Sequence, residues 1–179
     1  DKVAQQPARK PVVVFAVPGH SYTPGFVSSW TNFTTVNSMN QKVHLTYANT
    51  YSPNLYHCRN LLLGGDNLAG PFQAPWGGKL YYDYIFFLDT DQVFAVEQVY
   101  RLIDRMEADP NLQIVTGMYV MATGGKTPCV LDWDTDYFSQ NGKFDFKSPR
   151  QMMELGKSSP NGLVKAFYTG MGFSIFRKG

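Results

Sequence analysis

The sequence predicts an α/β fold built on a mainly parallel sheet with helices on its faces. Short runs of β-branched and aromatic residues alternate along the chain with segments whose apolar residues recur at helical spacing. The most apolar run, Tyr84–Leu88, reads Tyr-Ile-Phe-Phe-Leu and lacks the alternation of a strand that faces water. Parallel strands need helical crossovers and are buried on both faces, so the two observations favour a doubly wound sheet.

Two strand–helix units open the chain. We expect a first strand at 11–17, because its β-branched run stops at Pro18-Gly19, and then a helix over residues 24–39. A second strand is expected at 43–48. The next helix begins where Ser52-Pro53 supplies an N-cap and a first-turn proline, and it ends at Gly64-Gly65.

A third unit surrounds the most apolar strand. Residues 66–78 contain glycine and proline without periodicity and are expected to form a loop before the strand at 84–88. Apolar residues spaced over 96–106 then predict an amphipathic helix that closes before Pro110. A further strand is expected at 113–118.

The pattern changes in the last third of the chain. Strands are expected at 127–133 and 164–176, with a helix near 149–155 between them. We therefore expect a single domain that spans the whole chain. Its half 11–118 forms the parallel sheet, and its half 119–179 forms a smaller mixed β region.

Composition narrows the class of protein. The chain has 179 residues, of which 44% are hydrophobic and 17% charged, which excludes coiled-coil, collagen-like and disordered chains. A formal charge of +2 predicts no nucleic-acid groove, and no apolar run approaches the roughly 20 residues of a membrane span. Cys58 and Cys129 match no zinc spacing, so we expect reduced thiols, as in cytoplasmic proteins.

Residues that could bind a ligand or take part in catalysis follow the ends of the expected strands. Ligands of such sheets bind beyond the carboxyl ends of the strands, where 18–20, 49–51 and 89–91 lie. Asp89 and Asp91 would repel each other unless a cation lies beside them, and oxygen ligands favour Mg²⁺ or Mn²⁺. The alternative is that the two aspartates only cap a helix and occupy a loop.

These segments resemble a known family. The run YDYIFFLDTD at 82–91, preceded by SPNLYHCRN at 52–60, resembles the nucleotide-sugar-dependent glycosyltransferases of the Rossmann-like GT-A fold. VTGMY at 115–119 and TGMGF at 169–173 look like that family's later strand and its acceptor-side turn. The resemblance implies a nucleotide-binding half followed by an acceptor-side half.

The resemblance also implies roles for individual residues. Asp91 would bind the metal directly, and Asp89 would contact the ribose or a metal-bound water. The nucleotide-sugar would lie against Pro18, Gly19, His20, Tyr51, Asn54, Arg59, Asp89 and Thr90, and the sugar and acceptor against Trp133, Gly170, Met171 and Gly172. From the residues alone, Arg59 is equally well explained as a surface charge and Trp133 as a core residue, and His20 is slightly better explained as an ordinary surface histidine than as a contact to the base.

The implied activity is metal-dependent transfer of a sugar from a nucleoside diphosphate donor, a UDP-sugar, to a hydroxyl acceptor such as a glycan. Inverting members of the family place a carboxylate base after the Gly-Met-Gly turn, so we expect the base beyond Gly179, with the acceptor-side half truncated. Asp132, Asp134, Asp136 and Glu154 lack the expected position. Retention and inversion both remain open.

Two other functions fit parts of the pattern. LDTDQV also fits the nucleophile loop of haloacid-dehalogenase-type phosphatases, with Asp89 as nucleophile and Asp91 as general acid. That chemistry needs a lysine and a later acidic pair, and its nucleophile strand normally comes first in the domain. A non-catalytic module that binds a nucleotide-sugar is the second alternative.

Overall fold

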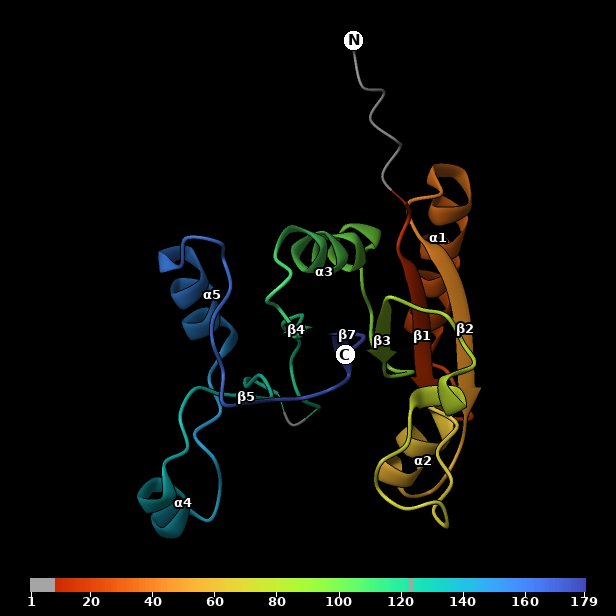
Figure 1. The fold of residues 1–179 in the computed structure, drawn as a ribbon. Coiled ribbons are helices and arrows are strands. Elements are labelled where there is room, and N and C mark those ends of the chain that lie inside the picture. The colour runs from red at the N-terminus through yellow and green to blue at the C-terminus, as the bar shows by residue number, and fades with distance from the viewer. Residues whose placement is uncertain (1–8, 123) are drawn as a thin grey trace. The chain divides into compact units, whose positions relative to one another are not determined.

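The computed structural model describes residues 9–122 and 124–179 and confirms the α/β class. Within these residues, five strands form one mixed sheet in the order β2-β1-β3-β7-β4, flanked by helices, and β5 pairs with β6 separately (Figure 1). The elements are β1 Val12–Pro18, α1 Pro24–Asn40, β2 His44–Thr50, α2 Leu55–Leu62, the 3₁₀ turn η1 Pro75–Gly78, β3 Tyr84–Leu88, α3 Val96–Ala108, β4 Ile114–Thr116, β5 Cys129–Val130, α4 Thr135–Asn141, α5 Pro149–Ser158, β6 Tyr168–Thr169 and β7 Phe173–Arg177.

The sheet is built around three parallel strands. β1 lies between β2 and β3, with Phe15 in register with Tyr47 on one side and with Phe86 on the other. Every residue of β3 and residues 13–18 of β1 are buried, as expected for strands covered on both faces. The carboxyl ends of the three strands therefore meet at one edge of the sheet.

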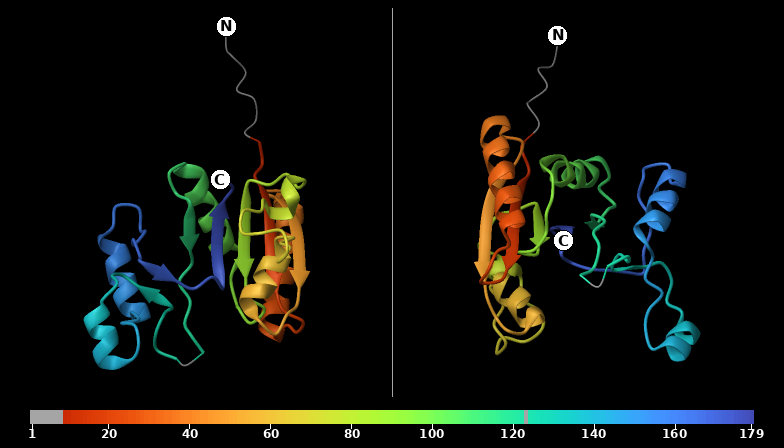
Figure 2. Two further views of the ribbon diagram at one scale, coloured as in Figure 1. Left: turned by 60° about the horizontal axis from the view of Figure 1, so that its bottom comes forward. Right: turned by 180° about the vertical axis from the view of Figure 1, so that it is seen from behind.

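β7 makes the sheet mixed rather than parallel throughout. The Arg177 N–H donates to the Gln113 carbonyl, and the Gly117 N–H donates to the Phe173 carbonyl, each at 2.9 Å. This pairing is antiparallel, and Figure 2 shows β7 running opposite to β1, β2 and β3. The strand expected at 113–118 therefore does not follow β3 in the sheet, because β7 is placed between β3 and β4.

Aromatic side chains hold α1 against the sheet. Phe15 of β1 packs on Phe33 of α1 with ring centroids 5.1 Å apart and stacks on Phe86 of β3 at 5.2 Å. Phe33 also meets Tyr100 of α3 at 5.9 Å. Burial of several large rings in one cluster supplies much of the hydrophobic driving force for this region.

A buried amide connects α1 to β2. Asn37 is 7% exposed, and its side chain donates to the Val43 carbonyl and accepts from the Val43 N–H. Both polar groups of the amide are thus satisfied inside the protein. The contact sets where β2 begins after the left-handed residue Gln41 ends α1.

Several element boundaries differ from those predicted. α2 begins at Leu55 with Asn54 as its N-cap, so Ser52-Pro53 lies outside the helix. The strand expected at 164–176 is divided into β6 and β7, and the one expected at 127–133 is only the two-residue β5. α4 was not predicted, whereas the predicted helix near 149–155 is confirmed as α5.

The chain divides into two compact units. One comprises the chain up to Val115 together with Ile175–Gly179, and the other comprises Thr116–Ser174. The division falls inside β4 and β7. The strand ends of interest at 18–20, 49–51 and 89–91 belong to the first unit.

Two further observations concern cysteines and membranes. Cys58 and Cys129 are both buried free thiols. None of the helices in the part of the chain that the structure describes combines the length and the apolar character of a membrane span.

Candidate functional site

The candidate site lies where β1, β2 and β3 end. The Gly19 N–H donates to the Thr50 carbonyl at 2.9 Å, which extends the pairing of β1 with β2 by one residue. The Thr23 N–H donates to the Thr90 carbonyl at 3.1 Å and so connects the start of α1 to the loop after β3. These bonds bring residues 18–20, 49–51 and 89–91 together at one edge, as ligand sites in open α/β sheets require.

Gly19 and Thr90 are packed directly against each other. Gly19 has a φ of +140°, which side chains rarely adopt, and a Cβ atom there would lie 2.9 Å from Thr90 Cγ2. Only glycine therefore fits both the backbone conformation and the space. This close approach keeps the loop after β1 beside the aspartate pair that follows β3.

Asn49 stabilises the same loop from β2. Its amide nitrogen lies 2.8 Å from the Val17 carbonyl and 2.8 Å from the Gly19 carbonyl, and donates to both. The two bonds hold the turn that follows β1. The sequence places Asn49 at a strand end but gives no signal for this bonding role, which depends on the neighbouring strand.

An aromatic pair stands on the exposed rim of the site. The rings of His20 and Tyr51 are 4.0 Å apart between centroids and meet at 62° in an edge-to-face arrangement. Both residues are exposed. Their rings offer flat surfaces on which a planar heterocycle could stack.

Arg59 forms an ion pair with Asp89. Arg59 Nη2 lies 3.2 Å from Asp89 Oδ1, and the two side chains are 14% and 30% exposed. α2 carries Arg59 to this place from beside the end of β2, where Cys58 Sγ contacts the Thr50 carbonyl at 3.3 Å (Figures 1 and 2). The predicted nucleotide-side residue Arg59 and the predicted acidic residue Asp89 are thus brought together.

The two aspartates have different surroundings. Burial raises the pKa of Asp89, Arg59 opposes this rise, and the negative charge of Asp91 adds to it, so the net shift is upward. Asp91 is exposed, and its carboxylate is 3.5 Å from Gln92 Nε2. Asp89 therefore already has a positive partner within the chain, the guanidinium of Arg59.

Asn54 has a local role in the structure. Its side-chain oxygen accepts from the His57 N–H at 3.1 Å and caps the N-terminus of α2. Asn54 itself is exposed. Capping accounts for an asparagine at this position without a ligand.

The predicted residues of the acceptor side belong to the second unit. Trp133 is 52% exposed and packs against Phe144 and Phe167 with centroids 5.0 and 5.4 Å away. It is therefore part of a partly exposed aromatic cluster, not a fully buried core residue. Asp134 accepts from the Tyr137 N–H as the N-cap of α4, which explains its presence structurally.

The turn at 169–173 is held by Tyr119. The Gly172 N–H donates to the Tyr119 hydroxyl at 3.1 Å, and a Cβ atom on Gly170 would lie 2.0 Å from that hydroxyl oxygen. Gly170 is therefore needed for close packing. Met171 between the two glycines is half-buried.

Comparison with models of known protein families and with curated proteins finds no match to this chain.

The residues present suit a divalent cation only in part. Asp89 and Asp91 offer carboxylate oxygens, which Mg²⁺ and Mn²⁺ prefer. Among residues 9–122 and 124–179, no group of three or more His, Cys, Asp and Glu side chains could hold a metal ion. A cation at this edge would thus take two carboxylates from the protein and its other ligands from phosphate oxygens and water.

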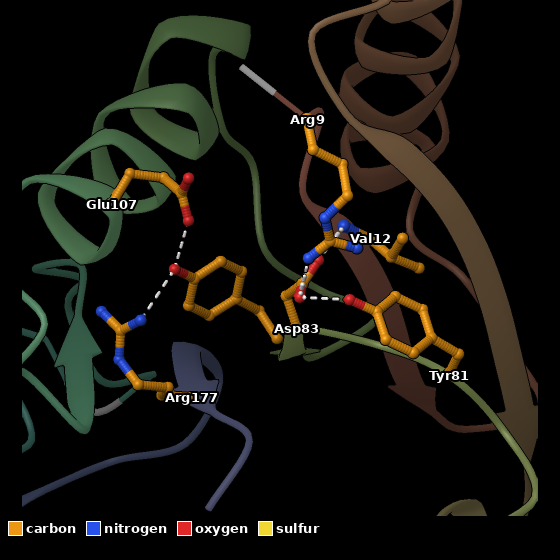
Figure 3. Close-up of polar contacts among 7 residues, drawn as sticks. Arg9, Val12, Tyr81, Asp83, Glu107 and Arg177 are labelled. Carbon is orange, nitrogen blue, oxygen red and sulfur yellow. Dashed lines mark hydrogen bonds and ion pairs between the residues drawn. The ribbon is translucent and has the colours of Figure 1, made fainter. Parts of the chain in front are cut away.

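A cavity of about 440 Å³ in the first unit is lined by residues around the amino ends of β1 and β3, and neither Asp89 nor Asp91 lines it. Several of its polar groups already have partners inside the protein. Asp83 accepts from the Val12 N–H at 2.7 Å and from Arg9 at 2.6 Å, and the Tyr84 hydroxyl accepts from Arg177 Nη1 at 3.1 Å and donates to Glu107 (Figure 3). These contacts connect β1, β3, β7 and the end of α3, so we interpret them as structural.

Proposed function

We propose that this chain is a metal-dependent glycosyltransferase of the GT-A type that moves a sugar from a nucleoside diphosphate donor, a UDP-sugar, to a hydroxyl acceptor. The observation that carries the proposal is the arrangement at the carboxyl edge of the sheet. Asp89, Thr90 and Asp91 directly follow the buried strand β3, and Gly19 packs on Thr90. Paired carboxylates at this position suit a divalent cation, and the cation in turn suits a diphosphate.

Different residues at the carboxyl ends of the strands would bind different parts of the donor. Asp89 and Asp91 would hold Mn²⁺ or Mg²⁺, which when bound neutralises negative charge on the diphosphate leaving group. Arg59 places a second positive charge beside Asp89, 3.2 Å from its carboxylate. The exposed rings of His20 and Tyr51 lie on the rim and suit stacking of the base.

Hydrogen bonds hold the loop after β1 in place beside the aspartates. The Gly19 carbonyl accepts from the Asn49 amide at 2.8 Å, and the Gly19 N–H donates to the Thr50 carbonyl at 2.9 Å. The absence of a side chain at Gly19 allows this loop to pack directly against Thr90, next to the aspartates. The loop is thus held in place before a donor binds, which lowers the entropic cost of binding.

Acceptor chemistry belongs to the second unit in this proposal. Trp133 and Phe167 present partly exposed rings, 52% and 62% accessible, of the kind that stack on the apolar faces of sugars. A carboxylate base would take the proton from the acceptor hydroxyl.

Calorimetry with nucleotides and metal tests the proposal. UDP, GDP, CDP and TDP are titrated into the protein with Mn²⁺ and with a chelator. We expect UDP to bind, and to bind more tightly when Mn²⁺ is present. If none of the four nucleotides binds under either condition, the proposed donor class is wrong.

A further inference from the structure

We propose that Arg59 is a built-in counter-ion that competes with the metal for Asp89 in the free protein and moves part of its bonding to the donor diphosphate when the nucleotide binds. The inference rests on the function proposed above and concerns the regulation of the same site. It predicts that metal binds weakly without nucleotide and that nucleotide binding releases Asp89 for the metal.

In the free protein, Asp89 already lies beside the positive charge of Arg59. Arg59 is 14% exposed and its guanidinium contacts a carboxylate that is 30% exposed, so water screens this pair less than a surface pair. A divalent cation that approaches Asp89 meets this positive charge. Asp91 is exposed and offers its carboxylate to a cation from the solvent side.

The geometry of the ion pair would allow Arg59 to exchange Asp89 for another anion. One contact joins the two side chains, from Nη2 to Oδ1 at 3.2 Å, whereas strong arginine–carboxylate pairs are bidentate and shorter. A single long contact can be exchanged for another anion at little loss. Phosphate is an anion that the planar guanidinium fork binds well.

The hydrogen bonding of the Arg59 guanidinium is incomplete. Its Nε is buried and has no hydrogen-bond partner among the described residues. A buried donor without a partner is unfavourable, so a small rearrangement that gives Nε an acceptor is favoured. An incoming diphosphate supplies acceptors at the place where Arg59 already lies.

The charge of Arg59, its single long contact with Asp89 and its unsatisfied Nε would together couple metal binding to nucleotide binding. The nucleotide draws the guanidinium towards its phosphates, and Asp89 then becomes available to the cation. Coupling of this kind is reciprocal, so the metal must strengthen nucleotide binding by the same factor.

Arg59→Gln separates this role from a structural one. Affinity for Mn²⁺ alone should rise by about fivefold or more, because the competing charge is removed. Affinity for UDP in the presence of a chelator should fall by about tenfold, because a charged hydrogen bond is lost. A role in folding alone would lower both affinities and the melting temperature.

Arg101→Gln is the matched control, since Arg101 is exposed on α3 and the substitution changes net charge equally. Both affinities should stay unchanged in this variant. Arg59→Lys keeps the charge but loses the planar fork, so Mn²⁺ affinity should stay within about twofold of the unaltered protein while UDP affinity falls. This variant decides the question if Arg59→Gln does not fold.

Two results would overturn the inference: Mn²⁺ affinity that is equal or lower in Arg59→Gln, or undiminished UDP affinity in that variant. Mn²⁺ is measured without nucleotide by electron paramagnetic resonance of the free ion. Failure of the proposed function looks different, because the unaltered protein would then bind no nucleotide while the Mn²⁺ comparison among the variants would still stand.

Discussion

Thr90 fills the space beside Gly19, so that a Cβ atom at residue 19 would lie 2.9 Å from Thr90 Cγ2. Because Gly19 also has a φ of +140°, the residue combines a close contact with a backbone conformation that other residues rarely adopt. The relationship places the loop after β1 against the loop after β3.

Gly19→Ala should lower the free energy of unfolding by about 1–3 kcal/mol, from backbone strain and the clash with Thr90. It should also weaken UDP binding, since the loop beside the aspartates must shift. Urea unfolding and calorimetry measure the two effects. Gly70→Ala is the control, because Gly70 has a φ of +80° but a Cβ atom there would meet nothing within 4 Å, and it should show only the smaller strain effect.

Asp91→Ala should remove the metal-dependent part of nucleotide binding, with a loss of about tenfold or more in affinity for UDP at saturating Mn²⁺. The melting temperature should stay within about 2 °C, because an exposed carboxylate that is repelled by its neighbour adds little stability. Asp136→Ala, an exposed acidic residue in α4, is the control and should bind as before. Unchanged Mn²⁺-dependent affinity in Asp91→Ala would remove Asp91 from the metal site.

Arg177→Met should lower the free energy of unfolding by about 2–4 kcal/mol, because a half-buried guanidinium that donates to carbonyls loses charged hydrogen bonds. Arg177 donates to the carbonyls of Leu112, Met106 and Asp109 and to the Tyr84 hydroxyl, which joins β7 to the end of α3. Arg101→Met removes an exposed arginine of α3 and should change stability little. Equal effects of the two substitutions in urea unfolding would contradict this account.

The stability contributed by Asp83 should depend on pH. Burial alone would raise the pKa of Asp83, but the Val12 N–H, Arg9 and Tyr81 donate hydrogen bonds to it and lower the pKa below its ordinary value (Figure 3). A carboxyl with a lowered pKa stabilises the fold above its unfolded pKa of about 3.9, and this contribution disappears as the pH falls through the folded pKa.

Asp83→Asn should therefore be less stable than the unaltered protein at pH 7, by about 1 kcal/mol. The difference should shrink as the pH falls below about 4. Urea unfolding at a series of pH values measures it, with Asp136→Asn as the exposed control. A difference that is independent of pH would show that the ionised form of Asp83 has no special role.

The phosphatase alternative predicts that Asp89 attacks a phosphate group, and the glycosyltransferase proposal predicts that it does not. With p-nitrophenyl phosphate and Mg²⁺, we expect no phosphate release above background, because Asp89 follows β3, the third strand of the chain, whereas the nucleophile of such phosphatases normally follows the first. Fluoroberyllate should likewise form no stable adduct at Asp89, as measured by mass spectrometry or ¹⁹F NMR. An adduct there would favour the phosphatase over the transferase.

Much of the fold was predictable because its signals are local. The run Tyr84–Leu88 is uniformly apolar and bounded by polar residues, and the structure confirms it as the fully buried strand β3. The helix expected over 96–106 is confirmed as α3, because its apolar residues fall on one face. α4 escaped prediction because Thr135–Asn141 has no apolar periodicity and depends on the cap from Asp134.

The sequence by itself determined the α/β class and the position of Asp89 and Asp91 at the end of a buried strand, since both follow from the order of neighbouring residues. Only the tertiary structure decided that β7 lies between β3 and β4 and that Arg59 pairs with Asp89, 30 residues away. Strand order and such pairings depend on how distant segments pack, and the energies that select them are not contained in any local pattern. The physical consequence is that Asp89, which the sequence predicts to bind a metal, has a positive partner in the same chain, Arg59.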